Sequence, residues 1–136
     1  MFNNLNMPTM NPVNHEFLMD LLKRDDLTLK STHERLCLPI ILRIYKKMLL
    51  GIKFPSIKIY GDLIIDGHHR YLASLLAGKT LETSPSGKSS ATIVTKWSEV
   101  ILISEDWDTV AKIHMLNVID ANYNGIDVDE LTELLQ

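Results

Sequence analysis

The sequence predicts an α+β fold, in which helices surround a small mixed β-sheet. Segments with helical spacing of apolar residues alternate with short segments rich in β-branched residues. The length of 136 residues suits one domain, and a content of 46% hydrophobic and 23% charged residues is typical of a chain with a packed core. We therefore divide the chain into an N-terminal arm, residues 1–14, and a single domain, residues 15–136.

Five segments are expected to be helical. The clearest has Ile41, Ile44, Tyr45 and Met48 on one face and ends where Gly51 can act as a C-terminal cap. The last is expected to start at an Asp-x-x-Glu capping box. The expected helices cover about 15–23, 38–50, 67–77, 104–122 and 127–135.

The expected strands are short. Residues 56–60 alternate apolar and polar side chains, and residues 63–65 form a buried apolar run after a Gly-Asp turn signal, so the two should pair as a hairpin. A further strand is expected at 100–103, and residues 24–31 contain a candidate edge strand. Residues 83–90, rich in serine, proline and glycine, are expected to form a loop.

The charges are unevenly distributed along the chain. The net charge of −3 argues against a general nucleic-acid binder. Residues 43–96 nevertheless contain nine basic and three acidic residues, a net +6, whereas residues 99–136 contain nine acidic residues and one basic residue, a net −8. The basic part either attracts an anionic ligand or complements the acidic part of the same chain.

Processing and membrane signals are missing from the sequence. The single cysteine, Cys37, cannot form an intramolecular disulfide. Residues 1–14 lack the features of a secretory signal, and no apolar run approaches the roughly 20 residues that span a bilayer. These observations lead us to expect a cytoplasmic protein with no membrane partner.

The motif Asp66-Gly67-His68-His69-Arg70 carries the most chemical information. It lies between the apolar strand 63–65 and a helix, and the first turn of a helix is a natural anion site. Gly67 allows close backbone approach, and Arg70 can hold two phosphate oxygens. The histidines can donate hydrogen bonds or transfer protons, and Asp66 can hold Mg²⁺ or accept a proton. Two adjacent histidines are not expected to be needed for packing, which favours a functional role.

The segment Ile64–Ala73, with the hairpin before it and Gly78 after it, resembles the ParB/sulfiredoxin-like superfamily. In that superfamily a Gly-x-x-Arg turn at a helix start binds nucleotide phosphates. Its members include CTP-hydrolysing partitioning proteins, ATP-dependent sulfiredoxins, free-serine kinases and domains described as nucleases. The resemblance covers about Lys53–Lys79, is specific for the superfamily rather than for one activity, and implies a nucleotide ligand, ATP or CTP, with Mg²⁺.

Carried over by position, the resemblance implies roles for the whole motif. Gly67, His68, His69 and Arg70 would bind phosphate. Asp66, His68 and His69 would be catalytic, and Asp66 would also hold the metal, as in kinase-like members that read Asp-Gly-His-His-Arg.

The chain also departs from particular members of the superfamily. It lacks the sulfiredoxin cysteine in the turn, because Cys37 lies at an expected helix start, and it ends before a helix-turn-helix domain could follow. The first departure argues against sulfinic-acid reduction, and the second argues against the centromere binding of partitioning proteins. The N-terminal glutamate that serves as base in kinase-like members has two candidates here, Glu16 and Glu34.

Three functions remain open at this stage. The first is a nucleotide-dependent kinase or NTPase. The second is a small nuclease or toxin-type effector with a dedicated inhibitor protein. The third is a binding module without catalysis, whose acidic C-terminal part contacts a partner protein. A nucleotide is the expected ligand in the first, and nucleic acid is the less favoured alternative.

Overall fold

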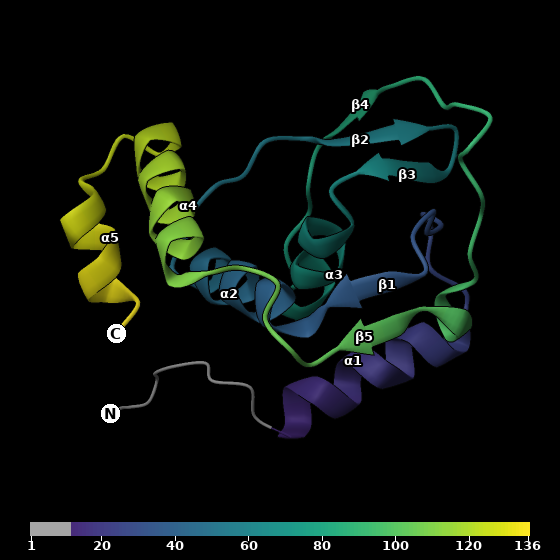
Figure 1. Ribbon diagram of the computed structural model, residues 1–136, viewed down its shortest axis with the longest axis horizontal. Helices are drawn as coiled ribbons and strands as arrows, with labels where there is room; N and C mark the ends of the chain where they lie inside the picture. Colours follow the sequence, from purple (N-terminus) through teal and green to yellow (C-terminus); the bar gives the residue numbers. More distant parts are fainter. Residues whose placement is uncertain (1–11) are drawn as a thin grey trace.

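The computed structural model describes residues 12–136 and has a mixed α+β fold, as the sequence predicts (Figure 1). Residues 1–11, which make up most of the expected N-terminal arm, lie outside the described part. The helices are α1 (Pro12–Arg24), α2 (Leu38–Leu49), α3 (His68–Ala77), α4 (Val110–Tyr123) and α5 (Val128–Leu134), with a short 3-10 helix η1 (Trp97–Glu99). The strands are β1 (Arg35–Cys37), β2 (Ile57–Tyr60), β3 (Leu63–Asp66), β4 (Thr83–Pro85) and β5 (Ile101–Ile103).

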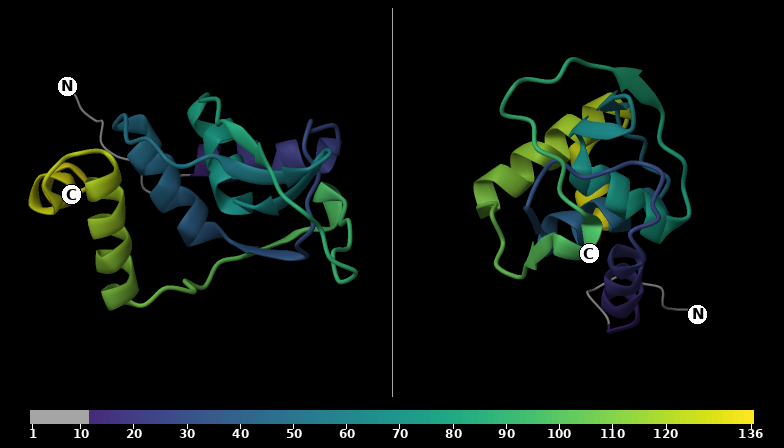
Figure 2. Two further views of the ribbon diagram at one scale, coloured as in Figure 1. Left: turned by 90° about the horizontal axis from the view of Figure 1, so that it is seen from above. Right: turned by 90° about the vertical axis from the view of Figure 1, so that its right-hand side faces the viewer.

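The strands form two small sheets. One has the order β3-β2-β4, with β2 antiparallel to β3 and parallel to β4, and the other pairs β1 and β5 in parallel. The expected hairpin is therefore confirmed as β2 and β3. Figure 1 shows α3 between the two sheets, and Figure 2 shows α4 and α5 together at one end of the molecule.

Several boundaries differ from the sequence-based expectations. The candidate edge strand at 24–31 is wrong, since only Lys30 and Ser31 make isolated bridges there. Strand β4 occupies part of the expected loop 83–90, and β1 was not expected. Both strands have only three residues and pair in parallel with distant segments, so local patterns give little sign of them.

The helix after β5 starts later than expected. It begins at Val110, where the side chain of Thr109 caps the N–H of Lys112, rather than at 104–108. Asp106 and Asp108 instead contact Arg43 on α2. The capping residue Asp127 of α5 is confirmed, although its carboxylate accepts from the N–H of Asp129, a contact within the first turn.

The main core lies around α3. Leu18 and Leu22 of α1, Ile41 of α2, Ile64 of β3 and Leu72 of α3 are almost fully buried and belong to one cluster. Helix α3 packs mainly against α2, and its first turn begins directly at the end of β3. The core therefore fixes the position of the Asp66–Arg70 motif. Among the described residues, no helix is long and apolar enough to cross a membrane.

Candidate functional site

The motif residues meet at one pocket. A cavity of about 370 Å³ is lined by the five residues of the motif, Asp66–Arg70, together with His33 from the segment before β1. The structure thus brings together every residue that the sequence singles out as catalytic, phosphate-binding or metal-binding, and adds His33. We call this cavity the turn pocket.

Gly67 is required for the shape of the turn. Its φ of +108° lies in the left-handed region, where a side chain is strained. A Cβ at this position would overlap Cγ2 of Ile57 and lie 2.8 Å from Nη2 of Arg70. The chain therefore changes direction here because glycine leaves room for both the β2 side chain and the guanidinium.

The turn leaves backbone donors at the pocket. The first backbone hydrogen bond of α3 runs from the N–H of Tyr71 to the carbonyl of Gly67 at 2.9 Å, so the N–H groups of residues 68–70 precede the helical ladder. These groups carry the partial positive charge of the helix N-terminus, which favours an anion.

His68 is a buried residue with one unused donor. Its side chain is only 2% exposed, and its Nε2 accepts from the backbone N–H of Thr32 at 3.0 Å. A backbone N–H can only donate, so the ring proton is on Nδ1. Nδ1 has no hydrogen-bond partner among the described residues. The expectation that the histidines are not needed for packing is wrong for His68, which is part of the core while keeping a free donor.

His69 is held in the same way. Its Nε2 accepts from the backbone N–H of Cys37 at 3.0 Å, and its ring meets Trp107 edge-on with ring centroids 5.7 Å apart. The same argument places its proton on Nδ1. Two adjacent histidines thus use Nε2 to hold the segment around β1 and keep Nδ1–H as donors.

Burial keeps both rings neutral. Desolvation, with repulsion from His33 and His69, lowers the pKa of His68 to about 3. Desolvation and His33 lower the pKa of His69 to about 4, against a smaller opposing effect of Asp108. Since each Nε2 already accepts a hydrogen bond, neither ring is free to take a proton, and the contacts favour hydrogen-bond donation over proton transfer.

His33 is the residue that sequence reasoning missed. Its ring stacks on that of His68 with centroids 3.9 Å apart and planes inclined by 14°. It is separated from His68 by 35 positions, and its spacing resembles no ligand motif, so no sequence signal identifies it. Of the two candidate bases, Glu34 follows His33 directly, whereas Glu16 is on α1.

Arg70 and Asp66 form the open side of the pocket. Nη2 of Arg70 lies 3.6 Å from Oδ2 of Asp66, and Nη1 donates to the carbonyl of Pro55 at 3.4 Å. The Asp66 side chain is 68% exposed, so this loose pair leaves the guanidinium able to bind another anion. Asp66 is an exposed carboxylate beside that anion position. No group of three His, Cys, Asp or Glu side chains that could hold a metal is found among residues 12–136.

The charge asymmetry of the chain is partly resolved by internal pairing. Lys47 on α2 pairs with Asp120 at 2.7 Å, Arg43 pairs with Asp106 and Asp108, and Lys46 donates to the carbonyl of Leu135. The basic residues of α2 therefore complement the acidic C-terminal part, as one of the two explanations requires. In the turn pocket, the positive charge of Arg70 faces the carboxylate of Asp66.

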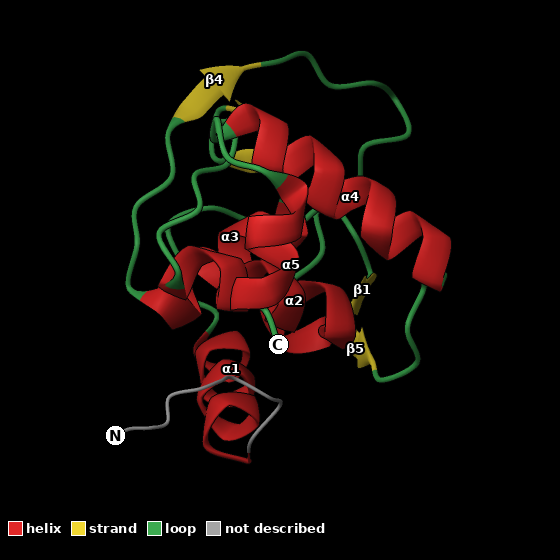
Figure 3. Ribbon diagram, turned by 90° about the vertical axis from the view of Figure 1, so that its left-hand side faces the viewer, coloured by secondary structure: helices red, strands yellow, loops and turns green. Residues whose placement is uncertain are grey.

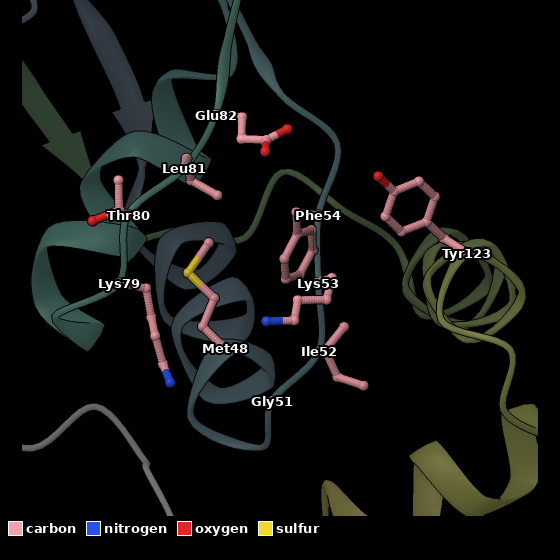
Figure 4. Close-up of a pocket in the computed structure, with 10 residues that line it drawn as sticks. All are labelled: Met48, Gly51, Ile52, Lys53, Phe54, Lys79, Thr80, Leu81, Glu82 and Tyr123. Carbon is pink, nitrogen blue, oxygen red and sulfur yellow. The ribbon is translucent and has the colours of Figure 1, made fainter.

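A larger cavity lies at the other end of α3. Figure 4 shows this space of about 480 Å³, with Lys53, Lys79, Phe54 and Tyr123 among its lining residues. Both α2 and α3 end here, and a helix C-terminus carries partial negative charge that lysines offset. The lysines thus have a structural explanation, and we place the candidate site at the turn pocket.

Comparisons with protein-family models, curated proteins and solved structures find no match to this chain. The case for a function therefore depends on the chemistry of the turn pocket.

Proposed function

We propose that the turn pocket binds the phosphate groups of a nucleotide and that the protein is a nucleotide-dependent enzyme of phosphate chemistry, a kinase or an NTPase, of the ParB/sulfiredoxin-like type. The observation that carries the proposal is the unpartnered Nδ1–H of His68, a buried donor at the N-terminus of α3. A buried donor without a partner is costly, and an oxyanion would satisfy it after a local opening of the turn, because Nδ1 itself is buried.

The other groups support the same ligand. The N–H groups of the first turn and Nδ1–H of both histidines donate to oxyanions without a change in ring charge. Arg70 adds a permanent positive charge in a fork that matches two phosphate oxygens. These donors all come from residues that line the turn pocket, which is why we assign them to one ligand.

Asp66 and Glu34 would take the remaining roles. Mg²⁺ is usually held by one or two carboxylates together with substrate phosphates, and the exposed Asp66 fits that pattern. The metal would neutralise charge on the phosphates. Glu34, the next residue after His33 in the chain, is the candidate for a base that orients the attacking hydroxyl or water. In this proposal the histidines stabilise charge instead of moving protons.

Binding without catalysis is the second candidate. Two observations favour it: Nε2 of both His68 and His69 already accepts a backbone hydrogen bond, and Asp66 is the one acidic residue among those that line the turn pocket. The same contacts argue against a nuclease that uses these histidines as acid and base.

A thermal-shift panel of ATP, CTP, GTP and UTP, with and without Mg²⁺, tests the proposal. A nucleotide at about 100 times its dissociation constant should stabilise the protein by about 2.7 kcal/mol. Arg70→Ala should abolish the shift, whereas Lys79→Ala, which removes a positive charge beyond the other end of α3, should retain it. No shift of the wild type with any nucleotide would contradict the proposal.

Turnover separates the enzyme from the binding module. If one nucleotide binds, release of phosphate or nucleoside diphosphate by the wild type supports the enzyme. In that case Asp66→Asn should lower turnover much more than it lowers binding. Binding with no turnover, alone or with candidate acceptors such as free serine, would favour the second candidate.

A further inference from the structure

An apolar slot is lined by residues of α2 and α4. Figure 3 views the molecule from the end at which α4 and α5 lie. The space measures about 250 Å³. Ile40 and Ile44 of α2 face it from one side and Ile113 and Leu116 of α4 from the other, with Phe54 from the segment before β2. Helix α4 lies outside the segment that carries the family resemblance.

Two ion pairs that link α2 to α4 and to the segment just before it line this slot. Nζ of Lys47 lies 2.7 Å from Asp120, and Nη2 of Arg43 lies 3.1 Å from Asp108. Helices with facing apolar side chains normally interdigitate them and leave few voids. Here the charged pairs fix the helices while the apolar side chains between them leave unfilled space, which is a suitable arrangement for an apolar ligand group.

Arg70 connects the slot to the turn pocket, because its side chain lines both cavities. Nη1 contacts the carbonyl of Pro55, a residue of the slot, and Nη2 faces Asp66, a residue of the turn pocket. Arg70 is therefore the residue at which the two cavities adjoin.

We propose that the slot binds the nucleobase of a nucleotide whose phosphates occupy the turn pocket, an inference that rests on the proposed function. A base has flat apolar faces suited to aliphatic side chains and Phe54, and polar edges suited to the ion pairs that line the slot. The volumes of about 250 and 370 Å³ together fall within the roughly 300–1,000 Å³ usual for small-molecule pockets.

The test compares ligands with and without a base on variants that fill the slot. ATP, CTP and inorganic tripolyphosphate are titrated calorimetrically into the wild type, Leu116→Phe and Met115→Phe. Leu116 lines the slot, whereas its neighbour Met115 does not and is 48% exposed, so the second variant is a matched control. Ile44→Phe fills the slot from α2 and replaces Leu116→Phe if that variant does not fold.

We expect ATP or CTP to bind the wild type at least about tenfold more tightly than tripolyphosphate. Leu116→Phe should remove that advantage while tripolyphosphate affinity stays within about twofold, and Met115→Phe should change neither. Equal affinity of nucleotides and tripolyphosphate for the wild type, or full nucleotide affinity in both slot-filling variants, would overturn the slot and leave the turn pocket standing. If none of the three ligands binds the wild type, the proposed function and the slot are both overturned.

Discussion

Each end of α3 is marked by a glycine, but the two ends differ in which hydrogen-bonding groups are left without a partner. Each has a glycine with positive φ, +108° at Gly67 and +66° at Gly78. At the C-terminal end, the N–H groups of Gly78 and Lys79 return to the carbonyls of Leu75 and Ser74. A Cβ on Gly78 would meet nothing within 4 Å.

The N-terminal end is crowded and incomplete by comparison. A Cβ on Gly67 would overlap Ile57, and the buried Nδ1–H of His68 has no partner among the described residues. The C-terminal glycine therefore only ends the helix, whereas the N-terminal glycine shapes a pocket that still has donors to satisfy. Positive φ is common to both ends, whereas the close approach to neighbouring side chains and the unpartnered buried donor are found at the N-terminal end.

The largest expected effect is that of Gly67→Ala on stability. Left-handed strain and overlap with Ile57 should together lower the free energy of unfolding by about 3–5 kcal/mol. Urea denaturation followed by circular dichroism measures this difference. A loss below about 1 kcal/mol would show that β2 and the turn shift readily to accept the added methyl group. The difference between the two ends of α3 would then be contradicted.

The second effect is a loss of stability in mild acid that originates at the N-terminal end. The unfolded histidines titrate near pH 6.5, whereas the folded pKa values are about 3 for His68 and about 4 for His69. Between these values the unfolded state binds more protons, so stability falls as the pH falls. Each histidine should therefore lower the free energy of unfolding of the protein by about 2 kcal/mol as the pH falls from 6.5 to 4.5.

Urea midpoints across this pH range measure the loss, with His69→Gln as the matched variant. Glutamine offers an oxygen that can still accept from the N–H of Cys37 but does not titrate. The variant should lose about half as much stability as the wild type over the same range. An identical pH dependence in the two proteins would contradict the assignment of His69 as a neutral buried ring.

The smallest effect is expected at the C-terminal end. Gly78→Ala should lower the free energy of unfolding by only about 1–2 kcal/mol, because alanine pays for the left-handed backbone but contacts nothing. The same urea denaturation gives the comparison with Gly67→Ala. A loss as large as that of Gly67→Ala would remove the distinction between the two glycines.

The sequence predicts the local parts of this arrangement well. The β2–β3 hairpin, the start of α3 at Gly67 and the end of α2 near Gly51 all follow from spacing and turn residues within a few positions. The motif residues also lie together at one pocket, since they are consecutive in the chain. Local sequence is sufficient for these features because their causes are local.

The long-range parts could not be predicted in this way. Strand β1, the stacking of His33 on His68 and the acceptance of backbone N–H groups by both histidines all depend on contacts between positions at least 32 apart. The pairing of Arg43 with Asp106 and Asp108 is long-range as well, whereas the start of α4 at Val110 follows from the local cap Thr109. Side-chain patterns within one segment do not encode such pairings.

Nuclear magnetic resonance can compare anion binding at the two ends of α3 within one protein. Tripolyphosphate is titrated into ¹⁵N-labelled protein, and the amide signals of residues 68–70 are compared with those of Gly78 and Lys79. We expect saturable shifts at residues 68–70 and at Nδ1–H of His68, with little change at Gly78 and Lys79, and their loss in Arg70→Ala. Equal shifts at both ends, or none at residues 68–70, would contradict this expectation.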